Sequence, residues 1–192
     1  MAVRSLFETR LYEAELEDEQ LLAPLAHSIR SLAEDDQAGR RWSKEHRYAG
    51  YTSYASLNDL PKRDPAFAEL TKLLRRHAAA FARDAGFELQ RTPRLDSLWV
   101  NLLKTGGQHS GHIHPHSFIS GTLYVEVPKS SGAIRFEDPR LPLMMSAPAR
   151  SDTFVSVEPY AGLLLMWESW LRHEVLSGTG KGERLSISFN FG

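Results

Sequence analysis

The chain has 192 residues, 42% of them hydrophobic, and its formal net charge is −1. These values predict one globular domain over residues 1–192, and the balanced charge gives no reason to expect a nucleic-acid partner. The absence of cysteine excludes disulfides, iron–sulfur clusters and thiolate-bound zinc, so any metal must be held by His, Asp or Glu.

The chain carries no recognisable targeting or membrane signal. Residues 1–8 lack the apolar core of a signal peptide. The apolar run 162–167 is far too short to cross a bilayer. We therefore expect a cytoplasmic location and no membrane partner.

Residues 1–90 are predicted to form a helical support region with one edge strand. The strand is expected at residues 5–12. A helix follows it, with Asp18 as the N-cap, and ends within the polar residues 34–41, which contain a glycine. A clearer helix is expected at 65–85, because Asp precedes it, Pro occupies its first position and Gly follows it.

Residues 42–60 are predicted to be irregular, and they contain three tyrosines, Tyr48, Tyr51 and Tyr54. One interpretation is an aromatic lid over a pocket. The other is a connecting loop whose rings simply pack against the body of the protein. His77, on the second helix, is interpreted as a packed helix residue and not as a metal ligand.

After residue 87 the pattern changes to short strands separated by Pro or Gly. About eight such strands are expected in residues 91–192, a spacing typical of a sandwich, jelly roll or barrel. A long loop rich in Pro and Met is expected at 138–152. The strands that the pattern defines best are 95–103, 120–127, 133–136, 154–157, 162–167 and 183–191.

Three histidines fall within five residues, at His112, His114 and His116. If the chain is extended there, His112 and His114 project from the same face and could bind one metal ion. Pro115 is expected to end the strand pairing and to take His116 out of register. The alternative is a loop whose histidines are solvated.

The last predicted strand alternates strictly between apolar and polar residues. Its polar face carries Arg184, Ser186, Ser188 and Asn190. This face either meets solvent or lines a polar pocket. In a pocket, the Arg184 guanidinium could bind a carboxylate with two hydrogen bonds, and the Ser186 hydroxyl could add another.

The order of these motifs resembles that of the 2-oxoglutarate/Fe(II)-dependent oxygenases, in particular the prolyl-hydroxylase-like group. The resemblance covers about residues 98–191 and rests on Gly106 before His112, a late His173, and Arg184 in an Arg-x-Ser motif eleven residues after it. Two further segments resemble a bacterial group of uncharacterised oxygenases, namely Ser-Gly-Thr-Leu-Tyr at 120–124 and Phe-Glu-Asp-Pro-Arg at 136–140.

The resemblance implies an α+β protein whose core is a double-stranded β-helix, a jelly-roll or cupin-like barrel buttressed by the N-terminal helices. It implies Fe(II) bound by His112 and His173, and 2-oxoglutarate whose far carboxylate pairs with Arg184, helped by Ser186 and Tyr124. Such an enzyme is a dioxygenase that hydroxylates a C–H bond of its substrate and releases succinate and CO₂.

The sequence departs from the family pattern at one ligand. The position that carries Asp in these oxygenases holds His114. A three-His site keeps the same open positions on the metal but is more positive, and zinc or another divalent metal stays an alternative to iron. We keep His112, His114 and His173 as the ligands, with Glu137 as a fourth candidate beside them.

Asn101 and Asn190 are candidates for groups that hydrogen-bond to the ligands, but ordinary strand or turn hydrogen bonding is the favoured interpretation of both. Two alternatives to the oxygenase remain: a three-His cupin-like metalloenzyme that does not use 2-oxoglutarate, and a non-catalytic jelly-roll binding protein. The substrate, a small molecule or a peptide, is not readable from the sequence, and a homodimer is left open.

Overall fold

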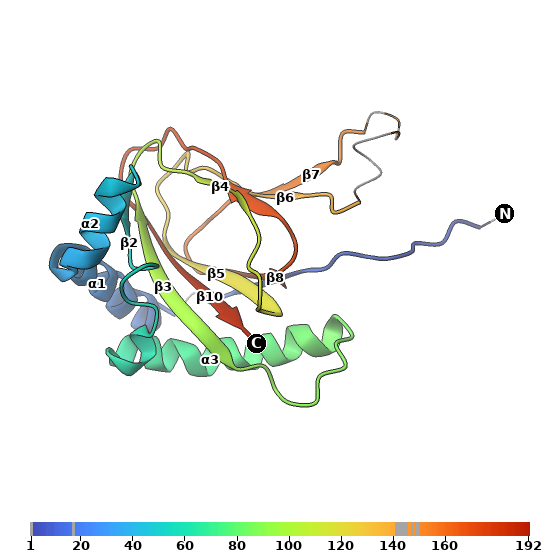
Figure 1. Cartoon of the computed structure of the whole chain (residues 1–192), viewed down its shortest axis with the longest axis horizontal. Coiled ribbons are helices and arrows are strands. Elements are labelled where there is room, and N and C mark those ends of the chain that lie inside the picture. The colour runs from blue at the N-terminus through green and yellow to red at the C-terminus, as the bar shows by residue number, and fades with distance from the viewer. Residues whose placement is uncertain (1, 17, 141–145, 147, 149) are drawn as a thin grey trace.

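The computed structural model describes residues 2–16, 18–140, 146, 148 and 150–192. It contains two β-sheets and a set of N-terminal helices (Figure 1). The predicted combination of helices and strands is confirmed. No helix in these residues is long and apolar enough to cross a membrane.

All pairings between the named strands of the two sheets are antiparallel. The larger sheet has six strands in the order β1 (Leu11–Glu15), β8 (Leu163–Glu168), β5 (Ile119–Glu126), β10 (Arg184–Phe191), β3 (Leu95–Leu103) and β2 (Gly50–Thr52). The smaller sheet has four in the order β4 (His109–His112), β9 (His173–Val175), β6 (Ile134–Glu137) and β7 (Phe154–Val157). Within the described residues, no strand pairing joins the two sheets into a closed barrel.

The three α-helices begin at side-chain caps, whereas the short 3₁₀ helix has no such cap. The helices are α1 (Glu19–Asp35), α2 (Gln37–Glu45), the 3₁₀ helix (Leu60–Lys62) and α3 (Pro65–Asp84). The Asp18 carboxylate accepts from the backbone N–H of Gln20, and the Asp64 carboxylate accepts from that of Ala66. Both predicted N-caps are therefore confirmed.

Helix α1 ends at Asp35, within the predicted range, but helix α2 is a correction, because no helix was predicted at Gln37–Glu45. The Asp36 side chain accepts from the backbone N–H of Gly39 and caps a new helix immediately after α1. Gly39 is required there for space, because a Cβ at this position would lie 2.8 Å from the Tyr51 ring. The glycine permits close packing inside a helix and does not end one.

The larger sheet is buried on both faces. Its apolar face packs against α1 and α3, and Ile187 and Phe189 of β10 are fully buried in this core. Its other face looks toward the smaller sheet, so that the larger sheet lies between the helices and the smaller sheet (Figure 1). The predicted alternation of β10 is thus confirmed, with its apolar side in the core.

Several predicted bounds were wrong. The first strand does not span residues 5–12 but begins at Leu11, where pairing with β8 starts, while residues 2–10 are exposed. Strands β2 and β9, each only three residues long, were not predicted. Part of the predicted loop at 138–152 lies outside the described residues.

Candidate metal centre

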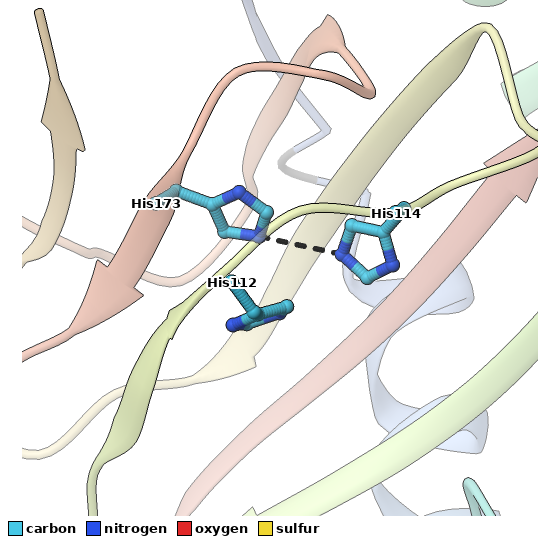
Figure 2. A group of neighbouring side chains, drawn as sticks. All are labelled: His112, His114 and His173. Carbon is cyan, nitrogen blue, oxygen red and sulfur yellow. Dashed lines mark hydrogen bonds between the residues drawn. The ribbon is translucent and has the colours of Figure 1, made fainter.

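Three histidines converge between the sheets. His112 and His173 are directly opposed in the antiparallel pairing of β4 with β9. His114 lies just beyond the end of β4, where its backbone N–H donates to the Ser169 carbonyl at 3.0 Å. Figure 2 shows the three rings gathered around one point, and their potential ligand atoms all lie within 4.8 Å of one another.

The spacing of the ring nitrogens fits a single ion. The Nε2 atoms of His114 and His173 are 3.3 Å apart. Two nitrogens that are each about 2.1 Å from one ion, at the angles of tetrahedral or octahedral coordination, are about 3.0–3.4 Å from each other. The ring centroid of His112 lies 4.4 Å from that of His173 and 5.0 Å from that of His114.

Backbone carbonyls fix two of the rings in the orientation that a metal needs. The Nδ1 of His173 is 3.0 Å from the Leu171 carbonyl, and the Nδ1 of His112 is 2.7 Å from the Ser110 carbonyl. A carbonyl can only accept, so each Nδ1 carries a proton, and Nε2 is the nitrogen of each ring that is left to bind a metal ion. Such hydrogen bonds commonly orient metal-binding histidines.

Burial keeps two of these imidazoles neutral. His173 is only 5% exposed, and its burial lowers its pKa to about 3. Burial, with a smaller contribution from His112, lowers the pKa of His114 to about 4. Because a metal ion binds the neutral imidazole, both side chains are in the ligand form well below neutral pH.

No carboxylate joins this cluster in the part of the chain that the structure describes. Glu137 accepts from the Arg172 Nε at 2.7 Å and lines a different cavity, together with residues of the N-terminal segment. Glu174, next to His173, accepts from the Arg135 Nε at 2.7 Å. Both acids are therefore engaged by arginines and not directed at the histidines.

The histidines open into a cavity of about 740 Å³ whose wall includes residues of both sheets. The polar face of β10 forms part of this wall, with Arg184, Ser186, Ser188 and Asn190. The structure thus places Arg184 and Ser186 in a pocket and not in solvent. Tyr124 of β5 lies beside them and is almost fully buried.

Arg184 is a buried cation with no carboxylate partner among the described residues. It is 5% exposed, and its one recorded hydrogen bond is from Nη1 to the Gly132 carbonyl at 3.0 Å. Its Nε is buried without an acceptor. Its guanidinium carbon lies 5.7 Å from the Tyr124 ring centroid, and burial lowers the pKa of Arg184 while it raises that of Tyr124 to about 12.

The two asparagines hydrogen-bond to other strand residues. The Asn101 side chain accepts from Thr52 Oγ1 at 2.9 Å and donates to Ser188 Oγ at 3.0 Å. The Asn190 side chain accepts from Ser120 Oγ at 2.8 Å. No direct bond from either to the three histidines is seen in the described chain, which favours the strand-bonding interpretation.

Sequence reasoning missed a polar pair in the same cavity, His109 and Tyr48. The Tyr48 hydroxyl lies 2.7 Å from His109 Nε2, and burial lowers the pKa of His109 to about 3. Residues three apart in a regular strand face opposite sides, but the register of β4 shifts between His109 and His112 and both side chains reach the cavity. The one available signal was a fourth histidine close to the other three.

The tyrosines of residues 42–60 divide between the two interpretations. Tyr48 and Tyr54 line the cavity, as the lid interpretation expects, and so does Trp42. Tyr51 instead belongs to the core, and its hydroxyl donates to the Asp36 carboxylate at 2.8 Å. The segment therefore packs on the body of the protein and contributes side chains to the cavity wall.

Comparison with solved structures defines the class of fold. The chain is similar to a prolyl-4-hydroxylase from Pseudomonas putida, with a TM-score of 0.66, 18% identity, and 95% of this chain and 92% of that chain covered. The epimerase SnoN from nogalamycin biosynthesis, described as α-ketoglutarate-dependent, has a TM-score of 0.68 at 16% identity, with 96% and 78% covered. HygX from Streptomyces hygroscopicus, solved with nickel and 2-oxoglutarate bound, has a TM-score of 0.65 at 14% identity, with 96% and 82% covered.

The sequence of the strand-rich part matches one family of proteins. Residues 97–190, which contain β4 to β9 and most of β3 and β10, match the family described as "Putative 2OG-Fe(II) oxygenase". This part of the chain, which contains the three histidines and Arg184, is therefore similar to that family. No protein of curated function matches the chain by sequence.

Proposed function

We propose that the protein is a 2-oxoglutarate- and Fe(II)-dependent oxygenase that hydroxylates an organic substrate in the cavity between its two sheets. One observation supports this function above all. Three convergent imidazoles share a single cavity with a buried arginine that has no carboxylate partner among the described residues. The first group suits a divalent metal and the second suits an organic acid, and the proposed chemistry needs both.

The metal would be held by His112, His114 and His173. All three present imidazole nitrogens toward one point. Because they lie in the cavity wall, the cavity side of a bound ion would stay open to other ligands. Rings also pack around His173, whose centroid is 4.6 Å from that of Trp167 and 6.2 Å from that of Phe136. These contacts hold the imidazole in place and keep water away from it.

The cosubstrate would be held by Arg184. Leaving a guanidinium buried without an anion is costly, and an incoming carboxylate would satisfy donors that the chain leaves free. Ser186, two residues along the same face of β10, and Tyr124 on the neighbouring strand flank the guanidinium as further hydrogen-bonding groups. When both are bound, iron and the keto acid would allow O₂ to oxidise a C–H bond of the substrate, with succinate and CO₂ as co-products.

The same proposal extends to the architecture and setting of the protein. The two facing antiparallel sheets support a double-stranded β-helix, the jelly roll of this family, buttressed by α1 and α3 within one domain. We further propose a cytoplasmic enzyme that acts on a small molecule or a peptide without a membrane or nucleic-acid partner. A homodimer is one possible assembly of the chain, and the mass of the protein in solution tests for it.

The experiment is an anaerobic titration. Purified protein loaded with Fe(II) is titrated with 2-oxoglutarate while the visible absorption is followed for the charge-transfer band of an iron-chelated keto acid. A saturable band supports the oxygenase and the three-His site together. Glutarate is a matched control, because it has the same chain and both carboxylates but lacks the keto group, and it should produce no band.

The other outcomes separate the alternatives. Stoichiometric iron binding without a band would favour a three-His metalloenzyme that does not use 2-oxoglutarate. Preferential zinc binding without iron would point to a zinc enzyme on the same fold. Failure to bind any divalent metal would leave a non-catalytic binding protein.

A further inference from the structure

The wall of the cavity contains no acidic residue among the part of the chain that the structure describes. Arg184 is its single permanently charged side chain, because Asp, Glu and Lys are all missing from it. Histidines and aromatic rings take up much of the remaining wall. The rings belong to Trp42, Tyr48, Tyr54, Trp99, Tyr124 and Trp167.

The acids on neighbouring strands do not compensate for this. Glu137 and Glu174 flank the histidine cluster on β6 and β9, but each is ion-paired with an arginine. Glu168 lies in a separate groove on the other side of the His114–His116 segment, where it accepts from the Trp170 indole at 2.8 Å. The charge inside the cavity is therefore set by Arg184 and by what binds there.

A loaded cavity would carry excess positive charge. A divalent ion and Arg184 together contribute three positive charges, and a dianionic keto acid cancels two of them. In the usual oxygenase site a ligand Asp cancels the third, but here that position is the neutral His114. One positive charge then remains in a cavity whose wall contains aromatic rings and no carboxylate among the described residues, and an uncompensated charge in such surroundings favours an anion.

We propose that the substrate of this site is an organic anion whose apolar body lies against Trp99 and Tyr54. This rests on the proposed function and specifies its substrate class. The Trp99 ring centroid is 5.9 Å from that of His114 and 5.2 Å from that of Tyr54. Tyr54 is 55% exposed and thus stands at the cavity mouth, so the two rings form a path from solvent to the histidines.

The test uses the iron- and 2-oxoglutarate-loaded protein under anaerobic conditions. Three probes of similar shape are added: phenylacetate, phenyl phosphate and the neutral phenylacetamide. At least one of the two anions should perturb the charge-transfer band at a concentration about tenfold or more below that of the amide. The ranking of phenylacetate and phenyl phosphate tells whether the anionic group is a carboxylate or a phosphate.

Three results would overturn the proposal: equal potency of the anions and the amide, no perturbation by either anion, or loss of the band as the anion displaces 2-oxoglutarate from Arg184. A missing band before any probe is added would instead contradict the proposed function. The two failures are therefore distinguishable.

The His114→Asp variant checks the physical cause. It restores the carboxylate of the usual site and removes the excess charge, so it should keep the 2-oxoglutarate band but lose the tenfold preference for the anion. A preserved preference in a variant that still shows the band would contradict the charge argument. If this variant fails to bind iron, the three probes on the unmodified protein decide the matter alone.

Discussion

The two sheets of this protein differ in how they are supported and in what they contribute to the site. The six-stranded sheet is covered by helices on one face and by the smaller sheet on the other, and Phe189 at its centre is fully buried. The four-stranded sheet ends in β7, where Val155 is 56% exposed. The larger sheet carries Arg184, whereas the smaller sheet carries His112 and His173.

This difference indicates a division of roles. The larger sheet supplies most of the packing and holds the buried guanidinium of Arg184. The smaller sheet contributes Ile134 and Phe136 to a second, smaller buried cluster and presents two of the three candidate metal ligands. Variants in the two sheets should therefore fail in different ways, and the following measurements test this.

The largest effect is expected for His173→Ala. This change removes one of the three candidate metal ligands, so we expect it to abolish stoichiometric iron binding. Metal analysis after desalting measures the bound iron. His27→Ala is the matched control, because His27 is exposed on α1 and should leave iron binding unchanged. Full iron occupancy in His173→Ala would refute the ligand assignment.

The next largest effect concerns stability. Phe189→Ala in the larger sheet should cost about 3–5 kcal/mol of unfolding free energy, because it leaves a cavity in the main core. Val155→Ala in the smaller sheet should change it by no more than about 0.5 kcal/mol, because that side chain is already exposed. Urea unfolding of the metal-free proteins measures both. Similar costs at the two positions would contradict the contrast between the sheets.

A third prediction separates anion binding from metal binding. Arg184→Ala should leave iron bound but weaken 2-oxoglutarate binding about thirtyfold or more, since it removes a buried partner of the far carboxylate. The titration of the charge-transfer band gives the affinity. Arg30→Ala is the control, because Arg30 makes an exposed ion pair with Glu126 on the outside of the protein. Unchanged affinity in Arg184→Ala would remove Arg184 from the site.

The smallest effect is a pH dependence of the metal-free protein. The pKa of His173 falls to about 3 in the folded state, below its ordinary value of about 6.5, so the unfolded chain binds more protons between these values. Stability should therefore fall as the pH drops below about 6.5, and His173 alone should account for about 2 kcal/mol between pH 7 and pH 5.

Urea unfolding at both pH values, with a chelator present, measures this loss for the unmodified protein and for His173→Ala. The variant should lose about 2 kcal/mol less, because it lacks the group that must be protonated. An identical loss in both proteins would mean that His173 is already protonated, or solvated, in the folded state.

The sequence predicted those elements whose local signals agree with their packing. Helix α3 follows from the Asp64 cap, Pro65 and its apolar stripe. Strand β10 follows from an alternation whose apolar residues all enter the core, and β3 follows from an apolar run that alternates between the core and the cavity. The short strands could not be predicted. The three residues of β9 are a strand because they lie between β4 and β6, which is a property of the fold and not of their own composition.

The site was predictable to a similar degree. Histidine spacing and the Arg-x-Ser motif identified residues that the structure brings into one cavity. Strand alternation does not explain the convergence of His112 and His114, because β4 ends at His112. The backbone hydrogen bond from His114 to the Ser169 carbonyl positions His114 instead. His109 was missed because the register shift in β4 leaves no mark in the sequence.

The placement of His173 and Arg184 on different sheets makes the occupied site a cross-link. A metal held by the smaller sheet would bind one end of the keto acid, and the larger sheet would hold the other end. The bound groups would then connect two sheets that no strand pairing joins in the described residues. Ligand at about a hundredfold above its dissociation constant stabilises the form that binds it by about 2.7 kcal/mol. Amide hydrogen exchange in β4, β6 and β9 should slow when both ligands are present, so these strands would gain much of their rigidity from the cofactors themselves.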